Sequence, residues 1–146
     1  MNIVGSDSPK FFECASIMRK YLPHIDFMPH CKIIYADNRY YGLITVDGDT
    51  VMYDHIILDK MVANPEVIFT VLTTLFSMGN IVNTFIDTDN AQAQRFVSGI
   101  GFINTGILRQ KPKALAIWSM TADEWQNNRI LRHFIKTTDK QTRLEI

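Results

Sequence analysis

The cysteines and histidines of this 146-residue chain form no recognisable metal-binding or nucleophile motif. Cys14 and Cys31 match no metal-ligand spacing, and two thiols do not make a disulfide framework. His24 and His30 flank Pro29, and two histidines alone make a poor zinc site. We therefore expect no metal centre. The thiols should be buried in a reducing environment, and both histidines should lie at the surface.

A second group of candidates consists of polar side chains in an expected strand and at the start of an expected helix. Asp54 and His55 are adjacent in a strand-like segment, so they must point to opposite faces of a sheet, and only one can face a cleft. Asn64, Pro65 and Glu66 mark the start of a helix, and a helix N-terminus can bind an anion. What these groups can do depends on the elements that position them.

Turn and capping signals divide the chain into short strands and helices. The stretch "CKIIYADNRYYGLITVDGDTVMYDHIIL" predicts three antiparallel strands, because Asp37-Asn38 and Asp47-Gly48 are tight-turn pairs. A very short strand in "MNIV" and a helix capped by Ser8 come before it. The expected strands are "MNIV", 31–36, 40–46, 50–58, 81–87, "FINTGILR" and "ALAIWSMT", and the later helices begin near Pro65, Asn90 and Thr121.

The order is therefore β-α-β-β-β-α-β-α-β-β followed by a C-terminal helix. An antiparallel meander that continues into a β-α-β unit predicts an α+β fold with one parallel strand pairing. We expect three layers, in which helices cover both faces of a mixed, mostly antiparallel sheet. The main domain should span residues 1–120, and residues 121–146 should form a C-terminal helix and a polar tail.

The expected C-terminal helix has features of an interaction element. Thr121 and Glu124 form a capping box, and the basic and acidic side chains that follow nearly balance. Trp125, Leu131 and Phe134 could anchor a protein partner or a second copy of the chain. The sequence thus allows a homodimer or a complex formed through this segment.

Composition and charge exclude several classes of function. Lys and Arg number 15, as do Asp and Glu, so the formal net charge is zero and a chain-wide basic field for nucleic acid is absent. No stretch resembles a signal peptide, and no apolar run approaches the ~20 residues of a transmembrane helix. We expect a cytoplasmic protein with no nucleic-acid or membrane partner.

Two local patterns on these elements resemble the GNAT (Gcn5-related N-acetyltransferase) superfamily. The stretch "ADNRYYGLITV" is similar to the first hairpin of that family. The stretch "NAQAQRFVSGIGF" is similar to its "N-x-x-A-x-x-x-Y-x-x-x-G-F" helix and following strand, with Asn90, Ala93, Gly101 and Phe102 in register. The resemblance covers about residues 1–120 and implies the GNAT three-layer fold.

The resemblance also implies an N-acyltransferase that passes an acetyl group from acetyl-CoA to the amine of a small molecule or peptide. The strand before the cofactor loop usually supplies a backbone N–H for the thioester, and often a carboxylate base. We favour Asp54 over His55 as this base. The alternative explanation of Asp54 is that it is a solvent-exposed residue at the end of a strand, without a catalytic role. The implied cofactor-binding residues are Ile57, Leu58, Ala63, Asn64, Glu66 and Asn90, although capping a helix would by itself explain Asn90.

Two departures from the family pattern bear on catalysis. The family's Gly-rich "Q/R-x-x-G-x-G/A" loop cradles a pyrophosphate, whereas the corresponding "LDKMVANPEVIF" has no glycine. It has Pro65, which lacks an N–H, and Glu66, whose charge repels phosphate. Val97 stands where the family often has a tyrosine that protonates the leaving thiolate.

Two functions follow from these observations. The first is an acetyltransferase with a divergent cofactor loop. The second is a catalytically degenerate protein of the same fold, a pseudoenzyme that acts as a structural or interaction component. The divergence is loosely similar to that of GNAT-like proteins of bacteriophages, and this second function would then belong to a virion protein.

Overall fold

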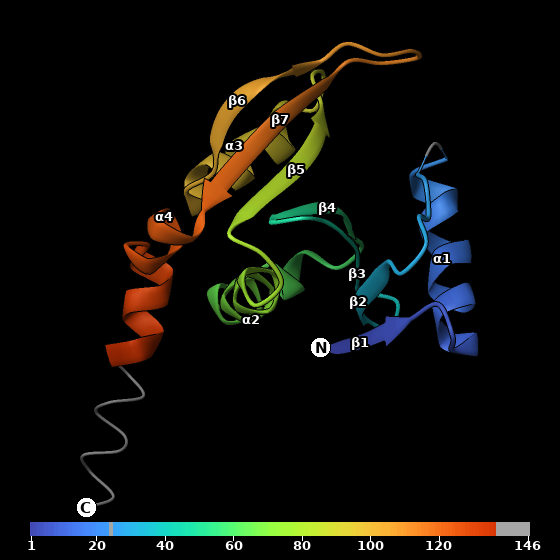
Figure 1. The fold of residues 1–146 in the computed structure, drawn as a ribbon, viewed down its shortest axis with the longest axis horizontal. Coiled ribbons are helices and arrows are strands. Elements are labelled where there is room, and N and C mark those ends of the chain that lie inside the picture. The colour runs from blue at the N-terminus through green and yellow to red at the C-terminus, as the bar shows by residue number, and fades with distance from the viewer. Residues whose placement is uncertain (24, 137–146) are drawn as a thin grey trace, which may run out of the picture.

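The computed structural model describes residues 1–23 and 25–136 and contains a single seven-stranded sheet (Figure 1). The strands are β1 (Asn2–Gly5), β2 (Lys32–Ala36), β3 (Tyr40–Asp47), β4 (Thr50–Ile57), β5 (Ile81–Asp87), β6 (Ile103–Leu108) and β7 (Leu115–Thr121). The helices are α1 (Pro9–Tyr21), the 3₁₀ turn η1 (Lys60–Val62), α2 (Pro65–Phe76), α3 (Ala91–Ile100) and α4 (Ala122–Gln126). His24 and the expected polar tail at 137–146 lie outside the described residues.

The strand order in the sheet is β1-β2-β3-β4-β5-β7-β6. The pair β4 and β5 is parallel, and every other neighbouring pair is antiparallel. The turns at Asn38 and Gly48 use positive φ angles of 60° and 61°, which suit these residue types in tight hairpins. The predicted order of elements and the mixed, mostly antiparallel sheet are confirmed.

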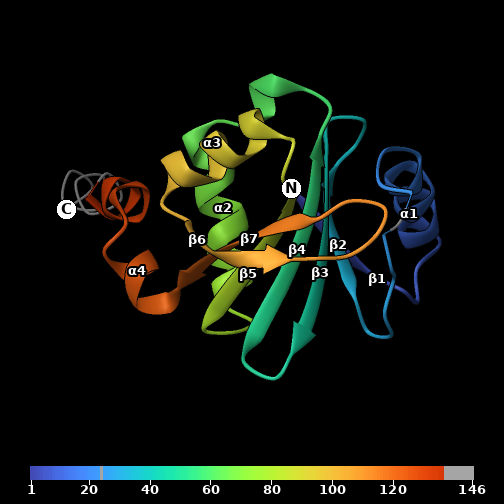
Figure 2. The same cartoon turned by 90° about the horizontal axis from the view of Figure 1, so that it is seen from above.

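Helices cover both faces of this sheet, so the three-layer prediction is also confirmed (Figure 2). Helix α1 packs on one face, here called the α1 face, where Phe11 and Met18 contact Ile33, Leu43 and neighbouring buried side chains. Helices α2 and α3 lie on the opposite face, here called the α2–α3 face, with the larger apolar cluster. Cys14 and Cys31 are buried in the α1-face cluster, and His30 is exposed.

Side-chain caps fix where the helices begin. Ser8 accepts a hydrogen bond from the Lys10 N–H at the start of α1. Asn64 and Asn90 do the same for α2 and α3, at 3.0 and 3.1 Å. Thr121 and the residue three positions after it form the predicted capping box of α4. Each cap satisfies an N–H group that would otherwise have no intrahelical partner.

The C-terminal segment differs from the single helix predicted there. Helix α4 ends at Gln126, and a second helical stretch covers 129–136. Asn128 separates the two, because its Oδ1 accepts from the Ile130 N–H at 2.9 Å and its Nδ2 donates to the Ile100 carbonyl at 2.8 Å. The side chain therefore starts a new helix while it ties the segment to the end of α3.

The apolar residues of this segment pack within the chain. Trp125 is 3% exposed and stacks on Phe76, and Leu131 is 7% exposed. The Phe134 ring stacks on Phe69 of α2 with centroids 4.8 Å apart. The three proposed partner anchors thus contact α2 or the core cluster of the same chain. This intramolecular packing accounts for their apolar character.

Candidate functional site

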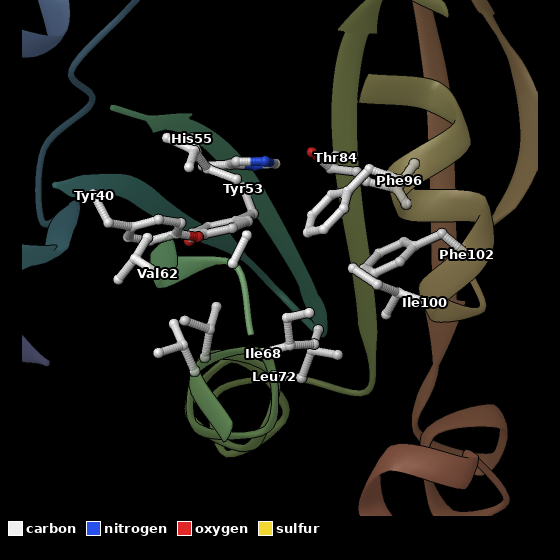
Figure 3. A pocket seen from close by; sticks show the side chains of 15 residues that line it. Tyr40, Tyr53, His55, Val62, Ile68, Leu72, Thr84, Phe96, Ile100 and Phe102 are labelled. Carbon is white, nitrogen blue, oxygen red and sulfur yellow. The ribbon is translucent and has the colours of Figure 1, made fainter. Parts of the chain in front are cut away.

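Strands β4 and β5 pair over only four residues and then diverge. The parallel pairing runs from Thr50–Ile81 to Tyr53–Thr84, whereas β4 continues to Ile57. The divergence opens a gap in the sheet, and a cavity of about 50 Å³ lies beneath it on the α2–α3 face (Figure 3). Its lining residues are Tyr40, Tyr53, His55, Ile57, Val62, Ala63, Val67, Ile68, Val71, Leu72, Thr84, Phe96, Val97, Ile100 and Phe102.

The cavity wall is apolar except at the sheet. Side chains of α2, α3 and the adjoining loops contribute only hydrocarbon and aromatic groups, such as Leu72 and Phe96. The polar side chains are Tyr40, Tyr53, His55 and Thr84, which come from β3, β4 and β5. An apolar cavity with a few polar groups on one side can orient a small ligand.

The two tyrosines of the cavity form a fixed pair. The Tyr40 and Tyr53 hydroxyl groups are hydrogen-bonded to each other in the interior, and burial raises the pKa of both. The Tyr53 ring occupies the space above Gly42, where a Cβ atom would overlap its hydroxyl and ring carbons. Glycine at this position of β3 therefore makes room for the pair. The adjacent Tyr41 faces the other side, in the α1-face cluster, as strand alternation requires.

His55 presents an unsatisfied nitrogen to this cavity. Its ring is stacked on Tyr53 with centroids 5.4 Å apart, and its Nδ1 atom is buried without a hydrogen-bond partner among residues 1–23 and 25–136. Burial lowers the pKa of His55 to about 4, so the imidazole is neutral at pH 7. The sequence analysis favoured the adjacent Asp54 as the base. The alternation of side chains along a strand was the one sequence feature that indicated His55 as the other candidate to face a cleft.

Asp54 lies on the other face of β4. Tyr53, His55 and Ile57 line the cavity, so the intervening Asp54 points to the α1 face, as Ile56 does. Burial raises the pKa of the Asp54 carboxyl to about 6. The carboxylate and the cavity are thus on opposite sides of the sheet, next to the same gap.

The two backbone positions predicted to contact a thioester differ in their hydrogen bonding. The Leu58 N–H donates to the Arg39 carbonyl at 2.8 Å, which continues the β3–β4 ladder. Hydrogen bonds to one neighbour alternate along an antiparallel strand, so the N–H groups of Ile57 and His55 point toward the diverged β5. Ile57 also lines the cavity, whereas Leu58 does not.

Several N–H groups of the loop between β4 and α2 are hydrogen-bonded within the loop. Asp59 accepts from the Met61 N–H at 3.0 Å and from the Arg39 side chain at 3.1 Å, and these bonds lower its pKa. The Ala63 N–H donates to the Lys60 carbonyl at 3.1 Å. Both ends of the Asn64 amide are also used, at Val67 and at the Met61 carbonyl. These groups stabilise the loop and are not free to bind a phosphate.

The remaining predicted positions fall into two groups. Ala63 lines the cavity, whereas Asn64, Glu66 and Asn90 do not. Asn90 caps α3, as its alternative explanation predicted. Phe96 and Val97 of α3 belong to the apolar cluster and form part of the cavity wall. Within the described ranges, no three His, Cys, Asp or Glu side chains are placed to hold a metal ion.

Comparison with solved structures identifies the fold. A candidate acetyltransferase of Acinetobacter baylyi ADP1 superposes with a TM-score of 0.60 at 12% identity, over 84% of this chain and 93% of that one. A spermidine N-acetyltransferase SpeG chimera from Vibrio cholerae and hSSAT gives 0.57 at 13% identity, over 80% and 82%. The aminoglycoside acetyltransferase AAC(6')-Ib in complex with coenzyme A and kanamycin gives 0.54 at 12% identity, over 67% and 69%.

These likenesses show that the chain has the GNAT fold. No protein-family model matches the sequence, and no curated protein matches it either. None of the helices in the described ranges is both long and apolar enough to span a membrane. What the site does must therefore be argued from its own geometry.

Proposed function

We propose that the protein is an N-acyltransferase that moves an acetyl group from acetyl-CoA to an amine. The observation that carries this proposal is the β4–β5 gap, which has a half-buried carboxyl group on one face and a small apolar cavity on the other. Such a gap lets two substrates meet from opposite sides of one sheet. The solved neighbours with spermidine, kanamycin and coenzyme A in their names support amine and CoA substrates.

The cavity has the size of a small substrate group. A buried water needs roughly 10–15 Å³ of such space, so a cavity of about 50 Å³ can take a small group such as the acetyl end of a thioester, and not a whole cofactor. The rest of the pantetheine arm would lie along the gap, where the Ile57 N–H points.

Asp54 is the proposed proton acceptor for the amine. A general base works best when its pKa is near the working pH, and burial brings the Asp54 pKa to about 6. An amine that approaches from the α1 face would meet this carboxylate first. With the proton held there, the amine nitrogen can attack the carbonyl carbon through the gap.

The second candidate function is a GNAT-fold component without catalysis. Three observations favour this function. Hydrogen bonds within the β4–α2 loop use N–H groups that could otherwise bind phosphate, and the Glu66 carboxylate lies at the start of α2. Val97 stands in place of a tyrosine. Such a protein would have a structural or interaction role. A bacteriophage virion protein remains the specific form of this alternative proposed from sequence, and the names of the three neighbours described above mention no phage.

Calorimetric titration with acetyl-CoA separates the two functions. We expect a dissociation constant in the micromolar range, and release of free coenzyme A when spermidine or kanamycin is added. Asp54→Asn should bind the donor as the wild type does while the rate of thiol release falls ~10²-fold or more. An absence of binding at millimolar acetyl-CoA would leave the non-catalytic function.

A further inference from the structure

One buried side-chain nitrogen of a cavity-lining residue has no hydrogen-bond partner in the part of the chain that the structure describes. Among the described residues, His55 Nδ1 and Trp118 Nε1 are buried without a hydrogen bond, and only His55 lines the cavity. Nearly all buried polar groups in native proteins are satisfied, so an orphan atom calls for a specific explanation. A ligand atom in the cavity would provide the missing partner.

The His55 ring is held in one orientation by its aromatic neighbours. It is nearly parallel to Tyr53 and Tyr40, with interplanar angles of 19° and 16°. The two tyrosine hydroxyl groups bond to each other, and neither bonds to the imidazole Nδ1. Figure 3 shows the His55 nitrogens and the Thr84 hydroxyl facing each other across the gap between β4 and β5.

The protonation state of His55 suits a hydrogen-bond donor. Burial keeps the ring neutral at pH 7, and a neutral imidazole has one N–H donor and one acceptor nitrogen. The groups around its ring in the cavity are apolar or hydroxyl-bearing. A donor preorganised in apolar surroundings stabilises developing negative charge strongly, since no water competes for it.

We infer that His55 donates a hydrogen bond from Nδ1 to the carbonyl oxygen of the acyl donor, and is a catalytic residue of the proposed acyl transfer. This inference rests on the proposed function. Attack by the amine nitrogen forms the C–N bond and moves the carbonyl π pair onto the oxygen that His55 contacts. When the C=O bond re-forms, the C–S bond breaks and the thiolate leaves with its electron pair. Asp54 takes the amine proton on the other face.

The two faces of β4 then have separate tasks. Asp54 handles the proton of the nucleophile on the α1 face, and His55 polarises the electrophile on the α2–α3 face. Strand alternation lets consecutive residues do this because their side chains leave the backbone in opposite directions. The charge of the oxygen would thus be stabilised by a side chain of the gap itself.

The test follows the carbonyl group directly. Acetyl-CoA labelled with ¹³C at the carbonyl is bound in the absence of amine, and the C=O stretching band is recorded by isotope-edited infrared spectroscopy. We expect a band at lower frequency than in water for the wild type and for His55→Gln, which keeps an N–H donor. In His55→Leu the band should shift back to higher frequency, and kcat with spermidine or kanamycin should fall ~10²-fold or more with little change in KM.

Asp54→Asn is the matched control, since it should lower kcat but leave the carbonyl band where the wild type has it. If His55→Leu does not fold, as judged by thermal unfolding, His55→Met takes its place. A wild type that binds no acetyl-CoA would overturn the proposed function and this inference with it. A donor that binds with the same carbonyl band in wild type and His55→Leu would overturn the inference alone.

Discussion

Asp54 and His55 are consecutive residues that respond to pH in opposite senses. Burial favours the uncharged form of each side chain, so the pKa of Asp54 is raised to about 6 and that of His55 is lowered to about 4. Between these values the folded chain holds more protons at Asp54 than the unfolded chain does, and fewer at His55. The contribution of Asp54 to the free energy of unfolding therefore falls as pH rises from about 4 to 6. The contribution of His55 to the free energy of unfolding falls as pH decreases from 6.5 to about 4.

Single substitutions should reveal these opposite pH dependences of the free energy of unfolding. Relative to wild type, Asp54→Asn should become more stable as pH rises from about 4.5 to 6.5, and His55→Leu should become more stable as pH falls over the same window. Each difference should reach about 1–2 kcal/mol, because one pKa unit corresponds to about 1.4 kcal/mol and both groups are partly exposed. Urea unfolding at three pH values measures this. Variant curves that run parallel to the wild type would contradict burial as the cause of the shifts.

At the residue scale, the sequence predicted that these two side chains lie on opposite faces but not which face holds the cavity. That depends on where α2 and α3 pack, and their contacts with β4 and β5 are long-range. Thr84 was not singled out for the same reason, since nothing in "IVNTFID" marks it as facing a gap. Asn64 and Asn90 were predicted as caps and are caps, because capping is a local property.

At the scale of elements, the packing of β3 against β4 depends on Gly42. Gly42→Ala should destabilise the fold by about 1–3 kcal/mol, since its Cβ would overlap the buried Tyr53 ring. Urea unfolding measures the loss, and the loss should be much smaller in a Tyr53→Leu background. Gly99→Ala is the matched control, because open space surrounds that position of α3 and alanine favours the helix. Equal effects at the two glycines would refute the overlap.

The start of α2 sets how well the protein can hold phosphate groups. Glu66→Lys should tighten coenzyme A binding by about 5–10-fold at low salt, since it replaces a repulsive charge at a positive helix end with an attractive one. Calorimetry with pantetheine, which has no phosphate, provides the control and should show no change. If both ligands respond alike, the charge is not acting through the phosphates.

Element boundaries were predictable where a local signal marks them. The strand at 81–87 and the helix starts at Pro65 and Ala91 agree with turn and capping chemistry. The C-terminal segment was predicted as one helix because Thr121–Glu124 starts one and the amphipathic pattern continues. The break arises from Asn128, whose bond to the Ile100 carbonyl joins residues far apart in sequence. The division of the chain at residue 120 stays a prediction.

For the whole molecule, the C-terminal segment is expected to act as part of the core. Trp125→Ala should lower the free energy of unfolding by about 3–5 kcal/mol, because the ring is buried against Phe69 and Phe76. Ile135→Ala, at an exposed position of the same segment, should change it by about 0.5 kcal/mol or less. Unfolding and sedimentation together decide the role of Trp125. A smaller assembly with unchanged stability would instead assign it to a contact between chains.

The four residue pairs that join β4 to β5 are the connection between two parts of the sheet, β1–β4 and β5–β7. All four lie at one end, so we expect the part β1–β4 to rotate against the part β5–β7 about them, with the other ladder hydrogen bonds kept. Widening the gap would separate apolar side chains of the cavity wall that belong to the two parts, such as Ile57 and Phe96. Backbone amides of His55 and Ile57 should exchange with deuterium faster than those of Val51 and Tyr53, which hydrogen-exchange mass spectrometry can measure. A donor arm longer than the resting cavity would enter by this hinge, and binding would slow the exchange of the same two amides.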